Sequence, residues 1–251
     1  MSQQNISYSD GLDIESPRLV PIISYPRFSA EGYAERIYEM KSLGITSIML
    51  GGRTMLSGTA VAGKGCVGLV VKACIDREIC ALKIRRIDAD RKSMDEEARL
   101  LKAANAAGAG PQIEAHTKNL IAMKFEDGPS IFEWANTAPK DRVRSMTKAI
   151  LEQCHALDLA GLDHGELSRL DRHVIMSHTP CIIDYESAST ARKTCNVTAA
   201  AQSIFLYGAV AERIKKTLGA PERDNVISAL RVYKQHQSAT SFQKVLESLP
   251  I

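Results

Sequence analysis

The pattern of apolar and polar positions divides the chain into a strand-rich first half and a helix-rich second half. Residues 1–28 are polar and proline-containing, and we expect them to form an extended arm. Apolar residues at helical spacing then run from Tyr33 to Leu43, and Gly44 is a typical helix stop. Short β-branched and apolar runs separated by turn residues predict the strands of a small β-rich lobe within 45–50, 60–87 and 119–125.

A single helix is expected among these strands, and the pattern turns helical after them. The helix covers Ser93–Gly108, and Ser93 and Glu96 have the spacing of a capping box. A glycine–proline break at 126–130 is followed by a long amphipathic stretch from Pro139 to Gly161. The remaining expected elements are two short strands within 173–184 and helical stretches at about 197–218, 221–236 and 240–248.

These elements predict an α+β fold of two lobes. An N-terminal extension (1–58) should pack its helix on a small β-rich lobe that contains one helix (59–127). A compact, mostly helical lobe (128–251) should follow the break.

Composition narrows the class of protein. The net charge of +3, from 32 basic and 29 acidic residues, is too balanced to indicate nucleic-acid binding. No apolar run is long enough to cross a membrane, and the start has no secretory signal pattern. The six cysteines form no Cys-x-x-Cys pair and are expected to be free thiols of a cytoplasmic protein.

Two glycine patterns overlap near residue 63. Residues 58–64 nearly spell a P-loop, but Gly65 replaces its Ser or Thr, and a β-rich run replaces its helix. The second pattern, G-x-G-x-x-G followed by a valine, lies between two expected strands, where backbone amides could close over phosphates. By itself this pattern is more typical of a plain hairpin turn, in which the glycines serve only the backbone conformation. Its residues are Gly63, Lys64, Gly65, Gly68 and Val70.

Lys83 and a glutamate of the following helix strengthen the phosphate hypothesis. Lys83 lies between apolar neighbours in the strand "ICALKIRR". Glu97 lies on the apolar stripe of the next helix, whereas Glu96 is expected to serve the cap. Because a charge on an apolar face needs a partner, we predict an ion pair between Lys83 and Glu97.

The second half carries the segments "HGEL" (164–167) and "IIDYE" (182–186). With the glycine pattern, Lys83 and Glu97, they follow the chain order of a protein-kinase-like fold over roughly residues 60–190. The sequence resembles atypical minimal kinases of the RIO and Bud32 type and small predicted archaeal serine/threonine protein kinases. "IIDYE" is also similar to segments of choline kinases and aminoglycoside phosphotransferases.

The resemblance implies ATP and Mg²⁺ as cofactors and assigns a role to each candidate residue. Lys83, oriented by Glu97, would bind the α- and β-phosphates under the glycine turn. Met123 would be the gatekeeper position, and Lys124, Phe125 and Glu126 would form the hinge beside adenine. In the second half, Glu166 replaces the catalytic aspartate, Asp171 replaces a metal-binding asparagine, and Asp184 is the other metal ligand.

These assignments favour an ATP-dependent serine/threonine protein kinase whose protein substrate is unknown. Both replacements keep an oxygen at their position, although Glu166 is longer than aspartate by one methylene. The alternatives are a nucleotide-binding ATPase-type switch or pseudokinase within a complex, and a small-molecule kinase. Between Asp184 and the next helix there is no long peptide-docking segment. The short segment that is present contains four hydroxyl residues as candidates for autophosphorylation: Ser187, Ser189, Thr190 and Thr194.

Overall fold

The computed structural model describes residues 11–56 and 58–251 and has the expected α+β composition. Residues 1–10 of the expected arm, and Ser57, lie outside the described residues. The chain forms two compact units. The first comprises the chain up to Arg99 together with 112–125, and the second comprises 100–111 and 126–251.

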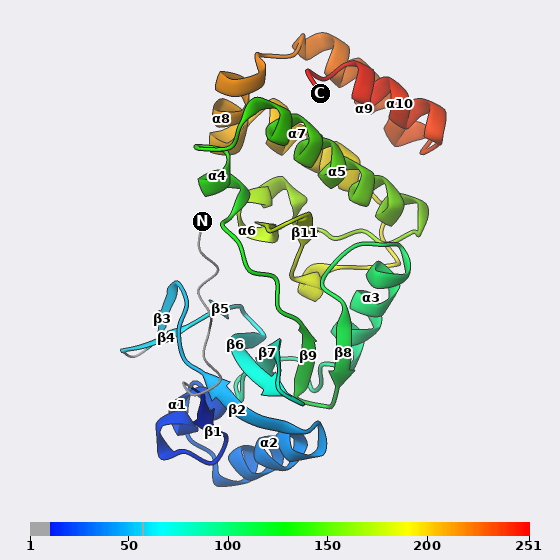
Figure 1. The fold of residues 1–251 in the computed structure, drawn as a ribbon. Helices are drawn as coiled ribbons and strands as arrows, with labels where there is room; N and C mark the ends of the chain where they lie inside the picture. Colours follow the sequence, from blue (N-terminus) through cyan, green and yellow to red (C-terminus); the bar gives the residue numbers. More distant parts are fainter. Residues whose placement is uncertain (1–10, 57) are drawn as a thin grey trace. The chain divides into compact units, whose positions relative to one another are not determined.

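The first unit is built on an antiparallel, seven-stranded sheet (Figure 1). Its two longest strands are joined by a tight turn in which Asp76 and Arg77 have φ of +48° and +68°, as a two-residue hairpin requires. Six strands pair in the order β1 (Leu12–Asp13), β2 (Ile45–Met49), β6 (Gly68–Ile75), β7 (Glu78–Arg85), β9 (Leu120–Lys124) and β8 (Ile113–His116). The seventh, β5 (Gly63–Lys64), pairs with β6, while β3 (Thr54–Leu56) and β4 (Thr59–Val61) form a separate hairpin.

The prediction of an extended arm is wrong for residues 11–28. This segment contains β1, a 3₁₀ turn (Pro17–Leu19) and the short helix α1 (Val20–Ile23). Leu19, Ile22 and Ile23 are almost fully buried in the core of the first unit. Burial of these apolar side chains stabilises a folded conformation of the segment. The prolines and polar neighbours had indicated an extended arm instead. Residues 11–28 therefore supply one strand and part of the core of this unit.

Helix α2 (Ala30–Ser42) has the predicted position and lies beside β2 (Figure 1). The Ser29 hydroxyl caps its start by accepting from the Gly32 amide, and Gly44 has φ +73° just beyond its end. Two charged residues of the helix, Arg36 and Glu39, are buried. Both therefore need partners within the protein.

Those partners are polar groups near one end of the sheet. The Arg36 guanidinium donates to the Arg85 carbonyl through Nε (3.2 Å) and Nη2 (2.8 Å), and to the Gly32 carbonyl through Nη1 (2.9 Å). The Glu39 carboxylate accepts from the Thr117 hydroxyl, and from the Asn119 amide nitrogens of backbone (3.0 Å) and side chain (2.6 Å). These contacts fix α2 on the strand that carries Lys83.

Helix α3 (Asp95–Ala106) follows the predicted stripe, but its first turn differs from the prediction. Met94, Ala98, Leu101 and Ala104 are buried, as expected. The expected capping box is wrong, because the Glu96 carboxylate binds the guanidinium of Arg99 at 2.7 and 2.8 Å. Ser93 accepts only from the Asp95 amide, at 3.4 Å. The unit boundary crosses the helix after Arg99.

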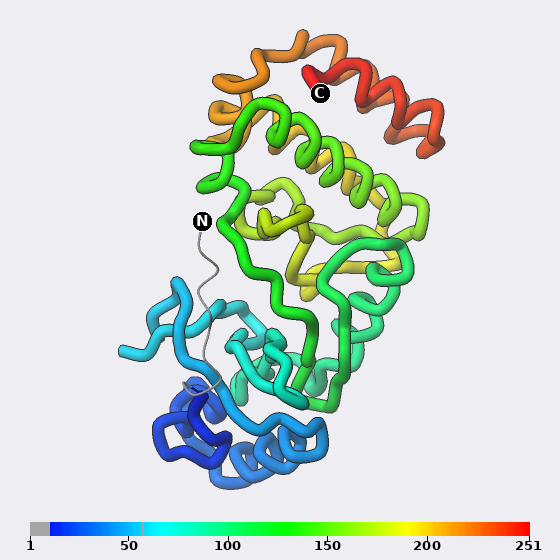
Figure 2. Tube along the Cα trace, viewed as in Figure 1, coloured from blue at the N-terminus to red at the C-terminus, as the bar shows by residue number. Residues whose placement is uncertain are grey.

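The second unit is mostly helical. Helices α5 and α7 lie side by side in both views (Figures 1 and 2). The stretch expected at 197–218 is two helices, because the chain breaks at Tyr207 and continues from Gly208 with φ +89°. The elements are α4 (Ile131–Trp134), α5 (Lys140–Leu159), α6 (Leu170–His173), β10 (Val174–Met176), β11 (Pro180–Ile182), α7 (Asn196–Phe205), α8 (Gly208–Leu218), α9 (Arg223–Gln235) and α10 (Ala239–Glu247).

Two expectations from composition can be compared with the structure. All six cysteines are free, and all except Cys66 and Cys195 are buried. Within residues 11–56 and 58–251, no helix is both long enough and apolar enough to cross a bilayer.

We predict that Arg36→Met lowers the free energy of unfolding by about 2–4 kcal/mol, because three donors to backbone carbonyls are lost from a buried site. In the same helix, Lys41→Met removes only an exposed ion pair with Glu15 and should change stability by less than about 1 kcal/mol. Urea unfolding followed by circular dichroism measures both. Equal midpoints for the two variants would contradict the anchoring role of Arg36.

Candidate functional site

The glycine pattern forms a tight turn between two strands, as predicted. Gly63 and Lys64 pair with β6, and the Gly65 amide donates to the Gly68 carbonyl at 2.8 Å. A Cβ on Gly68 would lie 3.0 Å from Lys83 Cγ and 3.1 Å from the Ile84 carbonyl oxygen. A larger residue here would therefore crowd the strand that carries Lys83. The strand that follows excludes the P-loop interpretation, which requires a helix.

The predicted ion pair between Lys83 and Glu97 is confirmed. Lys83 Nζ lies 2.6 Å from Glu97 Oε1, and the two side chains are only 5% and 6% exposed. Lys83 is directly opposite Val70 in the sheet, and Val70 is opposite Gly63. Register thus places the lysine two strands from the glycine turn, with its ammonium directed by a helix glutamate.

Met123, Lys124 and Phe125 lie at the end of β9, where the chain leaves the first unit. Met123 pairs with Ala81 of β7 and is half-buried, and Lys124 is exposed. The Phe125 ring is covered by the Lys72 ammonium, 4.3 Å from the ring centroid. The end of β9 thus places the half-buried Met123 and Phe125 close to β7 and β6, together with the charged side chains of Lys124 and Lys72.

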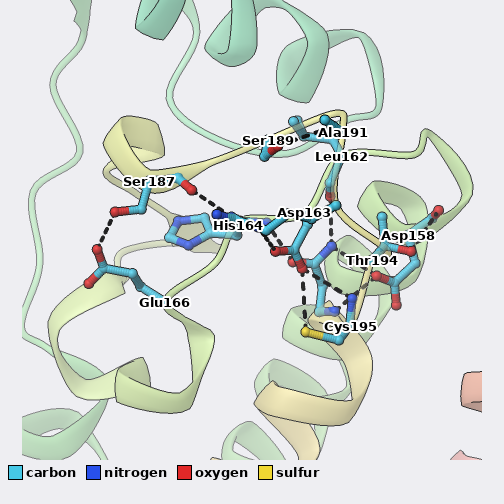
Figure 3. Close-up of polar contacts among 12 residues, drawn as sticks. Asp158, Leu162, Asp163, His164, Glu166, Ser187, Ser189, Ala191, Thr194 and Cys195 are labelled. Carbon is cyan, nitrogen blue, oxygen red and sulfur yellow. Dashed lines mark hydrogen bonds and ion pairs between the residues drawn. The ribbon is translucent and has the colours of Figure 1, made fainter. Parts of the chain in front are cut away.

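In the second unit, Glu166 contacts two side chains, and Figure 3 shows the contact with Ser187. Its Oε1 accepts from the Ser187 hydroxyl at 2.5 Å, and its Oε2 lies 3.1 Å from His173 Nε2. The Ser187 hydrogen bond, assisted by the nearby imidazoles, lowers the pKa of Glu166. The carboxylate is therefore ionised at neutral pH, while its side chain remains 36% exposed.

Gly165 lets the chain turn sharply just before Glu166. Its φ is +88°, and a Cβ there would lie 2.5 Å from Arg192 Nη2 and 2.9 Å from the Ser187 carbonyl oxygen. Both the conformation and the space therefore require glycine. This turn brings the Glu166 backbone next to the segment that carries Ser187.

His164 is a buried, neutral support of the same loop. Its Nε2 donates to the Ile183 carbonyl at 3.0 Å, and its ring meets those of His173 and Tyr185 edge-on at 5.4 and 5.0 Å. Burial lowers the pKa of His164 to about 4. The uncharged ring therefore packs the loop against the strand that ends at Ile182.

A buried network around Asp158, which the sequence interpretation missed, fixes the start of this loop. The Asp158 carboxylate accepts from the Asn196 amide (2.9 Å), the Asn196 side chain (2.9 Å), the Val197 amide (3.1 Å) and the Tyr233 hydroxyl (3.0 Å). Asn196 in turn donates to the Leu162 carbonyl (2.7 Å) and accepts from the His164 amide (2.9 Å). The sequence contains a signal for this network: Asp158 follows Cys154 by four residues and so lies on the buried stripe of α5, where a carboxylate needs partners.

The two candidate metal ligands differ in their surroundings. Asp184 follows β11 with φ +68° and ψ +78°, a conformation that is uncommon for a residue other than glycine. Burial lowers the pKa of His164, and the hydrogen bond from Ser187 lowers the pKa of Glu166. The negative charge of Asp184 acts to raise both pKa values. Asp171 lies on α6 and is exposed. The structure thus brings Asp184 near Glu166 and His164.

A magnesium site made by protein groups alone is not evident in the described part of the chain, where no three histidine, cysteine or acidic side chains cluster. Mg²⁺ commonly uses one or two carboxylates and completes its shell with phosphate oxygens and water. Asp184, in a strained backbone conformation beside the Glu166 loop, fits such a partial site. Asp171 supplies the right donor chemistry from an exposed position.

Comparison with known proteins gives little about activity. No protein-family model matches the chain. An uncharacterized protein of Methanocaldococcus jannaschii, MJ1211, is 29% identical over 96 residues, which is 38% of this chain and 83% of that protein. Its name states no activity, so any functional conclusion must come from the residues and their geometry.

We predict that His164 makes stability depend on pH. The unfolded imidazole gains a proton below its ordinary pKa, whereas the folded one stays neutral until about pH 4. The stabilisation is therefore complete above the unfolded pKa and is lost as the pH falls, by about 2 kcal/mol between pH 8 and pH 5. Urea unfolding at these two pH values measures this loss.

His164→Gln should reduce that loss, although it lowers stability at both pH values. The matched variant His178→Gln, in the exposed β10–β11 turn, should keep the wild-type difference. A wild-type difference that survives in His164→Gln would show that another group is responsible.

Proposed function

We propose that this chain is an ATP-dependent phosphotransferase of protein-kinase-like fold, acting as a serine/threonine protein kinase. The observation that carries the proposal is the buried Lys83–Glu97 pair beside the glycine turn. A buried ion pair adds little stability compared with an apolar pair of similar volume. A directed ammonium next to a strand-flanked glycine turn is instead what binding of a polyphosphate requires.

In this proposal the first unit binds the nucleotide. Backbone amides of the turn 63–68 contact the phosphates, and Lys83 binds the α- and β-phosphate oxygens with Glu97 holding its ammonium in place. Val70 and Met123 provide apolar surface for the base, and Phe125 follows at the end of β9. The geometry of the unit supports each of these roles by position.

The second unit supplies the carboxylates. Glu166 accepts a hydrogen bond from the substrate hydroxyl and orients it, and Asp184 and Asp171 would hold Mg²⁺. The ion, when bound, neutralises charge on the phosphates. Phosphoryl transfer has a loose transition state, so orientation of the hydroxyl matters more than strong basicity. An ionised carboxylate of lowered pKa suits this task.

A nucleotide switch with slow or no transfer is the second candidate. It is favoured by the full engagement of Glu166, whose two oxygens already contact Ser187 and His173. A foreign hydroxyl would compete with Ser187 for this carboxylate. Incubation with radiolabelled ATP, alone and with a basic protein, choline or an aminoglycoside, separates the candidates by where the label appears.

We predict that Mg-ATP at 100 times its Kd stabilises the protein by about 2.7 kcal/mol, raising Tm by roughly 5–10 °C. Asp184→Ala should lose the magnesium-dependent part of this shift, whereas Asp224→Ala, in the exposed first turn of α9, should keep it. Differential scanning fluorimetry with and without EDTA measures both. The absence of any shift at millimolar ATP would rule out the proposed nucleotide binding.

We further predict that Glu166→Gln lowers phosphoryl transfer by roughly 100-fold or more while ATP binding is retained, because a positioned acceptor contributes about that much. Glu166→Asp should not improve transfer, since the shorter side chain withdraws the carboxylate from the hydroxyl. Glu152→Gln, on the exposed face of α5, is the control. A strong gain in Glu166→Asp would favour the switch instead.

A further inference from the structure

We infer that Ser187 is the acceptor of phosphoryl transfer within its own chain, so that the enzyme modifies itself beside its catalytic carboxylate. The inference rests on the proposed phosphotransferase function. Its basis is the contact between the Ser187 hydroxyl and Glu166 Oε1 at 2.5 Å, which reproduces the contact required of a substrate hydroxyl (Figure 3).

Ser187 is the last residue of a 3₁₀ turn (Tyr185–Ser187), and the chain on either side of it is fixed by hydrogen bonds. Asp163 and Ser189 exchange two backbone hydrogen bonds, of 2.9 and 2.8 Å, in an antiparallel bridge. Arg192 donates through Nη2 to the Ser187 carbonyl at 2.6 Å and through Nε to Asp163 at 3.0 Å. Ser187 is therefore fixed by backbone contacts as well as through its side chain.

The other hydroxyls of the segment make different contacts. The Ser189 Oγ accepts from the Ala191 amide at 3.1 Å. Thr194 is buried and donates to the Gln237 side chain at 2.9 Å. Thr190 is exposed on the surface of the segment. Of the four serine and threonine residues here, Ser187 is the one bound to the proposed catalytic carboxylate.

The transfer step balances with a nucleoside triphosphate as the donor. The Ser187 Oγ forms a bond to the γ-phosphorus while the bond from that phosphorus to the β,γ-bridging oxygen breaks. The hydroxyl proton passes to Glu166 Oε1, and the diphosphate leaves with the electron pair of the broken bond. The products are a phosphoserine and ADP.

The product should move away from Glu166. A phosphoserine carries close to two negative charges at neutral pH, next to a carboxylate, and like charges at this distance repel. Arg192, which already donates to the Ser187 carbonyl, is a cation beside this serine that could pair with the new phosphate. Autophosphorylation would then free Glu166 for an external hydroxyl, and this gives the contact a regulatory meaning.

Phosphosite mapping tests the inference. Phosphatase-treated full-length protein is incubated with Mg-ATP, and peptides are analysed by mass spectrometry. We expect about one phosphoryl group per chain, located on Ser187, since one hydroxyl is held on the carboxylate. Ser187→Ala should abolish it, Ser187→Thr should yield phosphothreonine, and Ser189→Ala should leave it unchanged. The rate constant should not depend on protein concentration, as expected for transfer within one chain.

The possible failures point to different conclusions. If ATP binds and ADP forms, but the phosphoryl group is found elsewhere or only as free phosphate, the inference is wrong and the phosphotransferase proposal stands. If wild-type protein labels Ser187 of a tagged Asp184→Ala chain, transfer occurs between chains, and the intramolecular step is wrong. If neither an ATP-dependent thermal shift nor ADP is observed, the proposed function fails, and the inference fails with it.

Discussion

The ion pair between Lys83 and Glu97 is the constraint on which the first unit is organised. Both charges are buried and therefore need partners within the protein, and the helix has to lie where the 2.6 Å contact between them is possible. Register then fixes the glycine turn, because Gly63, Val70 and Lys83 form one row across β5, β6 and β7. An apolar pair would be at least as stable. On the proposed function, the two charges are explained by binding of the nucleotide phosphates.

In the second unit, too, a buried charged residue fixes the position of a candidate site segment. The carboxylate of Asp158 is buried at the end of α5 and receives four hydrogen bonds, and burial raises its pKa against the effect of those donors. Through Asn196 it fixes the Leu162 carbonyl and the His164 amide. The loop that ends at Glu166 is thus attached to the helical core, which gives a positioned carboxylate its required precision.

Features governed by local periodicity could be predicted from the sequence, and features governed by distant contacts could not. Strand alternation and helix spacing sufficed for β6, β7, α2 and α5, and for the pairing of Lys83 with Glu97, which are fourteen residues apart. Residues 11–28 were misjudged because their prolines and polar residues obscured a buried apolar group. The contact of Ser187 with Glu166, and that of Asn196 with Asp158, join residues 21 and 38 positions apart, which no local pattern encodes.

The glutamate at position 166 is best understood through these contacts. Its extra methylene carries the carboxylate outward, and the positive φ of Gly165 turns the backbone so that the longer side chain still meets a serine hydroxyl. His173 holds the second oxygen, which limits the rotation that a longer side chain would otherwise allow. Because a loose transition state needs an oriented hydroxyl more than a strong base, length and low pKa are compatible with transfer. On the proposed function, the replacement of aspartate is a change of reach rather than a loss of chemistry.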